Sequence, residues 1–122
     1  MKYKIIVLVL TVTTFSCRSK EEKESLARGR EVYITHCISC HRDTGEGVPG
    51  TYPSLIKPDR IVTAHTQRAI ILIKEGSGHE NGMRSISVND KEIADVLNYV
   101  QNSWDNKADF ILESQIDSIK NQ

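Results

Sequence analysis

The chain has 122 residues, with 16 basic and 16 acidic side chains, three cysteines and 39% hydrophobic residues. This length fits a single domain, and the balanced charge lacks the basic stripe of a nucleic-acid-binding protein, so no nucleic-acid partner is expected. Removal of residues 1–16 would leave 14 basic and 16 acidic residues, a net charge of −2 that is too small to indicate a partner by electrostatic steering.

Residues 1–16 predict a secretory signal. Lys2 and Lys4 precede the apolar run 5–15, and a small residue follows the run before a cleavage site. Only 13 residues separate Lys4 from Arg18, whereas a helix needs about 20 residues to span a bilayer. We therefore expect a signal that is removed on export, not a transmembrane anchor.

Cys17 follows the apolar run directly, and Thr14-Phe15-Ser16-Cys17 resembles the lipid-attachment box of bacterial lipoproteins. Lipid on this thiol would explain an otherwise unpaired cysteine in an exported chain and would anchor the protein on the periplasmic side of a membrane. The alternative is ordinary cleavage near Ser16, with Cys17 incidental. The charged segment 17–24 predicts a tether, or else the first turn of the next helix.

A first helix is expected over residues 25–36. Leu26, Val32 and Tyr33 give this helix an apolar side, whereas Gly29 interrupts it. A glycine inside a helix costs about 1 kcal/mol relative to alanine. The cost suggests that another backbone or ring comes close to the helix at Gly29.

The next five residues, Cys37-Ile38-Ser39-Cys40-His41, form the attachment signature of a covalent c-type haem. Two thiols three positions apart lie on one side of a helical turn, so both can reach the vinyl groups of one haem. His41 then supplies the imidazole that binds the iron as the proximal ligand. Because haem attachment consumes both thiols, it suits the oxidising compartment to which an exported chain is delivered.

Two other hypotheses remain open for the cysteine pair. A thioredoxin-like disulfide needs a strand before the motif in a βαβ pattern, and no strand pattern precedes Cys37. A zinc site needs four ligands, which Cys37 and Cys40 could complete only by recruiting His36 and His79. Neither hypothesis needs His41.

The rest of the chain predicts helices joined by long loops. All three prolines lie in the segment 42–59, which therefore forms a loop. Further helices are expected over 66–75 and over 89–104, the latter starting with the capping box Asn89-Asp90-Lys91-Glu92. A short last helix is expected because Leu112, Ile116 and Ile119 share one helical face. No segment alternates like a strand, so the predicted fold class is all-α, with three core helices and a short C-terminal helix.

The sixth ligand of the iron is predicted to be Met83. It is the one methionine after the predicted signal, and it lies in the Gly-containing loop 77–87. A thioether is a soft, neutral ligand, and a His/Met pair raises the reduction potential of a haem relative to a His/His pair. The competing side chains are His36, His65 and His79, of which His79 in the same loop is the strongest.

With these residues the chain resembles the class I c-type cytochromes, specifically the small bacterial single-haem proteins, over about 26–119. The resemblance rests on Gly29-x-x-x-Tyr33-x-x-x-Cys37-x-x-Cys40-His41, on Tyr52-Pro53-Ser54-Leu55, on Gly82-Met83 and on 88–104. It implies a cytochrome c fold over 25–122 with long loops around one covalent haem c. It also implies that Tyr52, Pro53 and Leu55 line the haem and that Gly29 packs against Tyr99.

The resemblance implies a function as well: one-electron transfer by a non-enzymatic, membrane-tethered periplasmic protein. Its expected partners are a respiratory oxidase, reductase or dehydrogenase, with no small-molecule substrate. One departure is Arg84, because proline commonly follows the ligand methionine in this family. Arg84 or Arg60 could pair with a haem propionate. A haem peroxidase or a gas-sensing protein with a labile sixth ligand is the alternative.

Overall fold

The computed structural model describes residues 18–56 and 66–122. Several predictions fall outside the described residues: the signal peptide, the lipid-bearing Cys17, Arg60 and His65. The elements are α1 (Lys20–His36), α2 (Ile38–His41), α4 (Thr66–Glu75), α5 (Asp90–Val100), η1 (Glu113–Gln115) and α6 (Ile116–Lys120).

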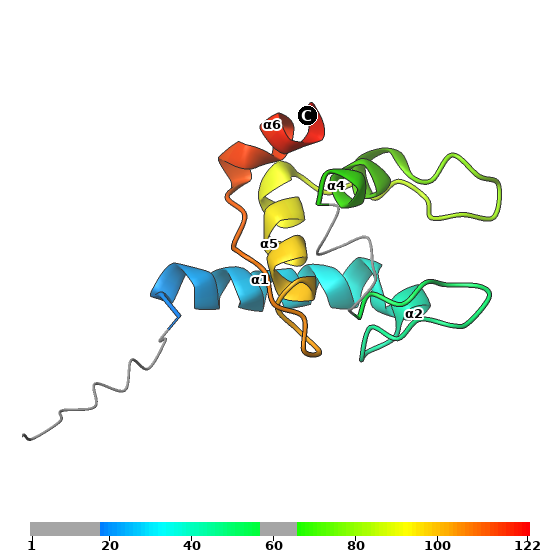
Figure 1. Ribbon diagram of the computed structural model, residues 1–122, viewed down its shortest axis with the longest axis horizontal. Coiled ribbons are helices and arrows are strands. Elements are labelled where there is room, and N and C mark those ends of the chain that lie inside the picture. The colour runs from blue at the N-terminus through cyan, green and yellow to red at the C-terminus, as the bar shows by residue number, and fades with distance from the viewer. Residues whose placement is uncertain (1–17, 57–65) are drawn as a thin grey trace, which may run out of the picture.

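The regular structure in the described ranges is helical, and the one β-bridge is the isolated pair Val48 and Tyr52. The predicted all-α class is confirmed, with α1, α4 and α5 as the three core helices and α6 as the short last helix (Figure 1). Among the helices of those ranges, none has both the length and the apolar content needed to cross a bilayer.

Helix α1 begins earlier than the sequence pattern predicted. Ser19 forms a capping box with Glu22, in which each backbone N–H donates to the other residue's side chain, at 2.9 and 3.2 Å. Two orphan amides at the helix start are thereby satisfied. Of the two alternatives for the segment 17–24, a tether or a helical turn, the structure has the first turns of the helix at residues 20–24.

The main packing contact of the molecule is the crossing of α1 and α5 (Figure 1). A Cβ at Gly29 would overlap the carbonyl oxygen of Asp95 and would lie 2.8 Å from the Tyr99 Cβ. Real Cβ atoms do not approach other atoms so closely, so the crossing requires glycine at this position. The predicted contact between Gly29 and Tyr99 is confirmed.

Buried polar side chains join the same two helices beside Gly29. Asp95 accepts from the Ser25 hydroxyl at 2.7 Å and from the Arg28 guanidinium at 2.7 and 3.1 Å. Asn98 donates to the Ser25 hydroxyl at 3.0 Å, which extends the network along α5.

The ionisation of Asp95 couples this network to pH. Burial alone would raise the pKa of Asp95, but the hydrogen bonds from Arg28 and Ser25 outweigh burial and hold the pKa below its usual value. A lowered folded-state pKa stabilises the fold above the unfolded-state pKa of about 3.9. That contribution is lost as the pH falls through the lower folded-state value.

Helix α5 starts at its predicted capping box but ends at Val100 rather than at Trp104. Trp104 and Asp105 adopt positive φ angles of 50° and 68°, which a helix cannot contain. The Asn106 side chain donates to the carbonyl oxygens of Val100 at 2.9 Å and Leu55 at 2.8 Å. It therefore satisfies a carbonyl at the helix end and fixes the turn that follows.

The chain after this turn runs back along α5 and then packs α6 on α4 (Figure 1). Ile111 exchanges two hydrogen bonds with the Asn98 side chain, at 2.7 and 2.9 Å. The predicted apolar face of the last helix is only partly correct, because Ile116 is fully buried and Ile119 half-buried, whereas Leu112 is 60% exposed. Leu112 precedes η1 and so does not share the helical face.

Replacing Gly29 with alanine should destabilise the protein. Alanine favours a helix by about 1 kcal/mol over glycine, but overpacking at a close helix crossing costs typically about 1–3 kcal/mol. We expect the free energy of unfolding of Gly29→Ala, measured by urea denaturation of the holoprotein, to fall below that of the wild type. Arg30→Ala, at the exposed neighbouring position, should stay within about 0.5 kcal/mol. A Gly29→Ala protein more stable than the wild type would contradict the close crossing.

Candidate haem site

The Cys-x-x-Cys-His motif forms a short helical turn at the end of α1. Cys37 closes α1 by donating its N–H to the Tyr33 carbonyl at 2.9 Å, and its own carbonyl accepts the His41 N–H at 2.9 Å. The motif spacing therefore becomes one turn of α2, with both thiols free and half-buried.

The environment of Cys37 does not favour thiol exchange. Burial, followed by the neighbouring Cys40, raises the pKa of the Cys37 thiol to about 11. Catalytic exchange cysteines instead have a lowered pKa, since the thiolate is the nucleophile. The thioredoxin-like hypothesis also needed a strand before the motif, and α1 occupies that position.

His41 is held in one orientation by the loop that follows the motif. Its Nδ1 lies 3.0 Å from the carbonyl oxygen of Pro53. When Nδ1 donates to this carbonyl, Nε2 carries no proton and is available as a metal ligand. Burial lowers the pKa of His41, partly opposed by the hydrogen bond to Pro53. The ring is therefore neutral at neutral pH, as metal binding requires.

Two aromatic side chains from the helix crossing fix the first turn after His41. The Tyr33 hydroxyl donates to the carbonyl oxygen of Arg42 at 2.6 Å, and the Trp104 indole N–H donates to that of Asp43 at 3.1 Å. Tyr33, Tyr99 and Trp104 pack as a cluster with ring centroids 5.3 to 5.7 Å apart. Sequence reasoning missed these roles of Tyr33 and Trp104, although a lone tryptophan just past the last core helix was a possible signal.

The segment 52–55 returns to the haem motif, and three of its residues have different contacts there. Pro53 orients His41 through its carbonyl. Leu55 is half-buried against the hydrophobic core, and its N–H donates to the Gly45 carbonyl at 2.7 Å. Tyr52 is 39% exposed, and its backbone pairs with Val48.

Met83 lies in a loop that is closed on the end of α4. The Ser77 N–H donates to the Met83 carbonyl at 2.8 Å, and the Ile86 N–H donates to the Ile73 carbonyl at 2.8 Å. Gly76 adopts a φ of +78°, and a Cβ there would lie 2.8 Å from the Met83 carbonyl oxygen. The loop backbone therefore packs directly on the helix terminus.

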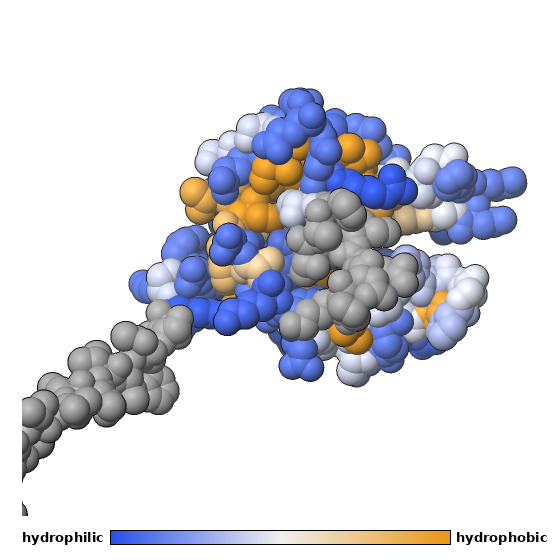
Figure 2. Space-filling model, in the orientation of Figure 1, coloured by the Kyte–Doolittle hydropathy of each residue, from blue (hydrophilic) through white to orange (hydrophobic). Residues whose placement is uncertain are grey.

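Met83 and His79 differ in their surroundings within this loop. Met83 is half-buried and packs against the hydrophobic core, whereas His79 and Arg84 are exposed. The remaining described rival, His36, is also exposed, at the end of α1. The Met83 loop and the loop after α2 extend to the same side of the molecule (Figure 1), and the surface recedes between them (Figure 2).

The donor atoms at this site fit a covalent haem c. The motif supplies two free thiols and an imidazole with one available nitrogen, and the loop 77–87 carries a thioether; these are the groups that c-type haem ligation uses. The part of the chain that the structure describes contains no cluster of three or more histidine, cysteine or acidic side chains suited to a metal ion. The zinc hypothesis is not supported, because His36 and His79 do not join the cysteines in such a cluster.

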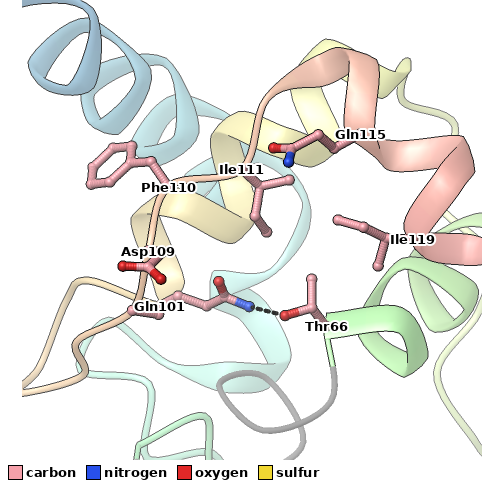
Figure 3. Close-up of a pocket in the computed structure, with 8 residues that line it drawn as sticks. Thr66, Gln101, Asp109, Phe110, Ile111, Gln115 and Ile119 are labelled. Atoms are coloured by element: carbon pink, nitrogen blue, oxygen red, sulfur yellow. Dashed lines mark hydrogen bonds between the residues drawn. The ribbon is translucent and has the colours of Figure 1, made fainter.

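A second hollow lies elsewhere, between α5 and the C-terminal segment (Figure 3). Its walls include Thr66 and Gln101, joined by a hydrogen bond of 3.2 Å, and Phe110, Ile111 and Ile119. Among the residues that the structure describes, the lining of this hollow contains no cysteine, histidine or methionine, so none of them offers a donor for a haem there.

Comparison with known proteins agrees with the haem c indicated by these donor atoms. The cytochrome c family profile matches residues 26–104. The cytochrome c subunit of a quinone alcohol dehydrogenase from Gluconacetobacter polyoxogenes is 31% identical over 90 residues, which cover 66% of this chain and 19% of that protein. Cytochrome c-552 of Thermus thermophilus is 32% identical over 101 residues, which cover 64% of this chain and 69% of that protein.

The dehydrogenase subunit is thus much longer than the matched region, since the match spans about a fifth of its length. The profile match, in contrast, extends from Leu26 of α1 through Cys37 and Cys40 to the turn at Trp104. This chain belongs to the cytochrome c family, whose members carry a covalently bound haem c with its iron.

Proposed function

We propose that this cytochrome is an exported, membrane-tethered one-electron carrier with His/Met ligation of its haem iron. The observation that carries the proposal is the position of Met83, half-buried in a loop closed on α4. A sixth ligand held by the fold is what separates an electron carrier from a haem protein that binds substrates or gases at an open position.

Each residue of the site has a distinct role in this proposal. Cys37 and Cys40 would attach the haem through thioethers, and His41 and Met83 would be the two protein ligands of its iron. The haem supplies reversible Fe(III)/Fe(II) chemistry when bound. The chain contributes the neutral imidazole that Pro53 orients, the sulfur ligand, and the apolar surroundings that include Leu55. Tyr52 is proposed to cover the ring.

The first described residues and the haem motif lie at opposite ends of α1. The described chain starts at Arg18, just before the helix, whereas the motif follows His36, and the 17 residues of α1 correspond to about 25 Å. A lipid on Cys17 would therefore leave the haem end free to dock to a membrane-bound oxidase, reductase or dehydrogenase.

Relatives support the last of these partner classes. One similar protein is, by its name, the cytochrome c subunit of a quinone alcohol dehydrogenase. We propose that this chain likewise exchanges electrons with another redox protein and binds no small-molecule substrate.

A haem peroxidase or gas sensor is the second candidate function. The observation that favours it is Arg84, because an exposed arginine follows Met83 where proline would stiffen the loop. A labile iron–sulfur bond would then open the sixth position to exogenous ligands. The next experiment separates the two functions.

Replacing Met83 with alanine should leave the covalent haem in place but remove the sulfur ligand. We expect the weak far-red absorption band of the ferric protein, which reports iron–sulfur ligation in this family, to disappear. The reduction potential should fall by on the order of 0.1 V or more, since axial ligands tune haem potentials over about 0.8 V. Both are measured by spectroscopy and redox titration of the purified holoprotein.

His79→Ala is the matched control in the same loop and should leave the band and the potential unchanged. The opposite result would assign the ligand to His79: Met83→Ala would then keep the far-red band and the reduction potential of the wild type, and His79→Ala would change them. A wild-type protein without the band that binds added ligands readily would favour the sensor or peroxidase function.

Replacing Cys17 with alanine should release the cytochrome from membranes if that thiol carries lipid. The measurement is the distribution of the red protein between membrane and soluble fractions in a host that attaches haem. Ser19→Ala, a nearby substitution that leaves Cys17 in place, should remain membrane-bound. A Cys17→Ala protein that stays with the membranes would show that the anchor is not this lipid.

A further inference from the structure

The C-terminal segment beyond Asn106 lies outside the 26–104 region that matches the cytochrome c family. In this chain the segment ends in α6, which packs against α4 (Figure 1). Of all the described helices, α6 is the one that α4 packs against most extensively, ahead of α5. Helix α4 is therefore fixed in the structure largely by a part of the chain that the family pattern does not include.

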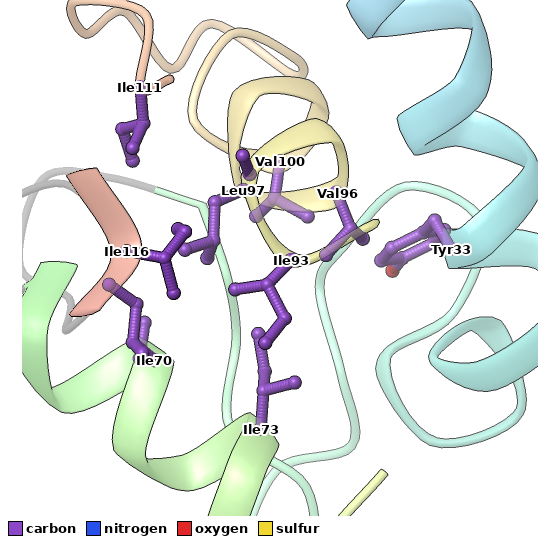
Figure 4. Packing of buried hydrophobic residues seen from close by; sticks show 11 residues of the cluster. Tyr33, Ile70, Ile73, Ile93, Val96, Leu97, Val100, Ile111 and Ile116 are labelled. Carbon is purple, nitrogen blue, oxygen red and sulfur yellow. The ribbon is translucent and has the colours of Figure 1, made fainter. Parts of the chain in front are cut away.

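The apolar part of this contact centres on Ile116. Its side chain is 0% exposed and points toward Ile70 of α4 and Leu97 of α5 (Figure 4). Ile70 is also 0% exposed, and both belong to the main hydrophobic core. Ile116 thus joins α6 to α4 inside the core rather than at its surface.

The polar part of the contact gathers on the last two residues of α4. Lys74 lies 2.7 Å from Asp90 at the start of α5 and 3.2 Å from Asp117 of α6. Glu75 lies 2.6 Å from the Lys120 ammonium. These ion pairs fix the end of α4 from two directions.

The same end of α4 carries the backbone contacts that hold the Met83 loop. Gly76 and Ser77 follow Glu75 directly, and the Ser77 N–H donates to the Met83 carbonyl. The close approach of Gly76 to that carbonyl leaves no room for a side chain. A displacement of the end of α4 would therefore move the backbone of Met83 with it.

We infer that α6 positions the sixth haem ligand: Ile116 and Lys120 hold the end of α4, and α4 holds the loop that presents Met83. The inference rests on the proposed ligation by Met83. Ile116 and Lys120 are positioning residues, since they act on the loop through their contacts with α4. Weakening the contacts of Ile116 and Lys120 with α4 raises the population of a locally opened state in which the sulfur leaves the iron. Local opening depends on how many packing and polar contacts hold a segment.

The experiment is an imidazole titration of the ferric holoprotein, because imidazole binds the iron only when the sulfur has left. The wild type should show the far-red band and bind imidazole weakly. Ile116→Ala should bind imidazole about tenfold more tightly, equivalent to a shift of about 1.4 kcal/mol in the opening equilibrium. The same variant should lose its far-red band at a lower temperature than it unfolds.

Ser25→Ala is the matched control for general destabilisation. It removes a hydroxyl that joins α1 to α5 through Asp95 and Asn98, and it is linked to the C-terminal segment indirectly, through the bonds of Asn98 to Ile111. Its free energy of unfolding should fall, while its imidazole affinity stays within about twofold of the wild type. An equal gain in imidazole affinity for Ser25→Ala and Ile116→Ala would overturn the inference, since loss of stability alone would then explain both.

A charge exchange tests the inference without touching the core. The side chains of Lys120 and Glu75 are 29% and 55% exposed, so substitutions there should leave the protein folded. Lys120→Glu should bind imidazole about threefold more tightly, and adding Glu75→Lys should restore the wild-type affinity. The role of Lys120 would be overturned if Lys120→Glu had the imidazole affinity of the wild type. It would also be overturned if the double variant failed to restore that affinity.

The wild-type spectrum separates the inference from the proposed function. A wild type with the band, whose α6 variants behave like Ser25→Ala, would refute the positioning role and leave ligation by Met83 standing. A wild type without the band would refute ligation by Met83, and the inference with it.

Discussion

The close crossing of α1 and α5 at Gly29 is the constraint on which the rest of the structure depends. The missing side chain lets the Asp95 carbonyl and Tyr99 approach the α1 backbone, and Ser25, Arg28 and Asp95 join the two helices beside that point. The haem motif continues directly from α1, and Trp104 follows α5. The crossing thereby fixes the start of the haem motif and the position of Trp104, which bonds to the loop after His41.

The loop after His41 and the loop that carries Met83 are held in different ways. The loop after His41 is held by side chains that bond to its backbone: Tyr33 to Arg42, Trp104 to Asp43. The Met83 loop is held by backbone contacts to the end of α4, and α4 is braced by α6. If Met83 is the sixth ligand as proposed, a change in the C-terminal segment is expected to alter the methionine side of the site while the histidine side stays unchanged.

The parts of the fold set by local chemistry were predictable from the sequence. The Cys37–His41 motif, the capping box at Asn89 and the need for close packing at Gly29 each follow from neighbouring residues. The sequence left the start of α1 open between a tether and a helical turn, because residues 20–24 have no apolar side chain; their helix has the Ser19 cap and ion pairs to Arg28. The turn after the early end of α5 depends on Asn106 bonding to Leu55 and on Trp104 packing with Tyr33, which are contacts between residues distant in the sequence.

The most direct test of the account is the mass of the peptide that contains Cys37 and Cys40, from protein exported by a host that attaches haem. The account predicts one haem on this peptide, bound through both cysteines, in a red protein whose His41 orientation depends on the Pro53 carbonyl. A folded, colourless protein in which both thiols remain free, or in which they hold zinc, would contradict it.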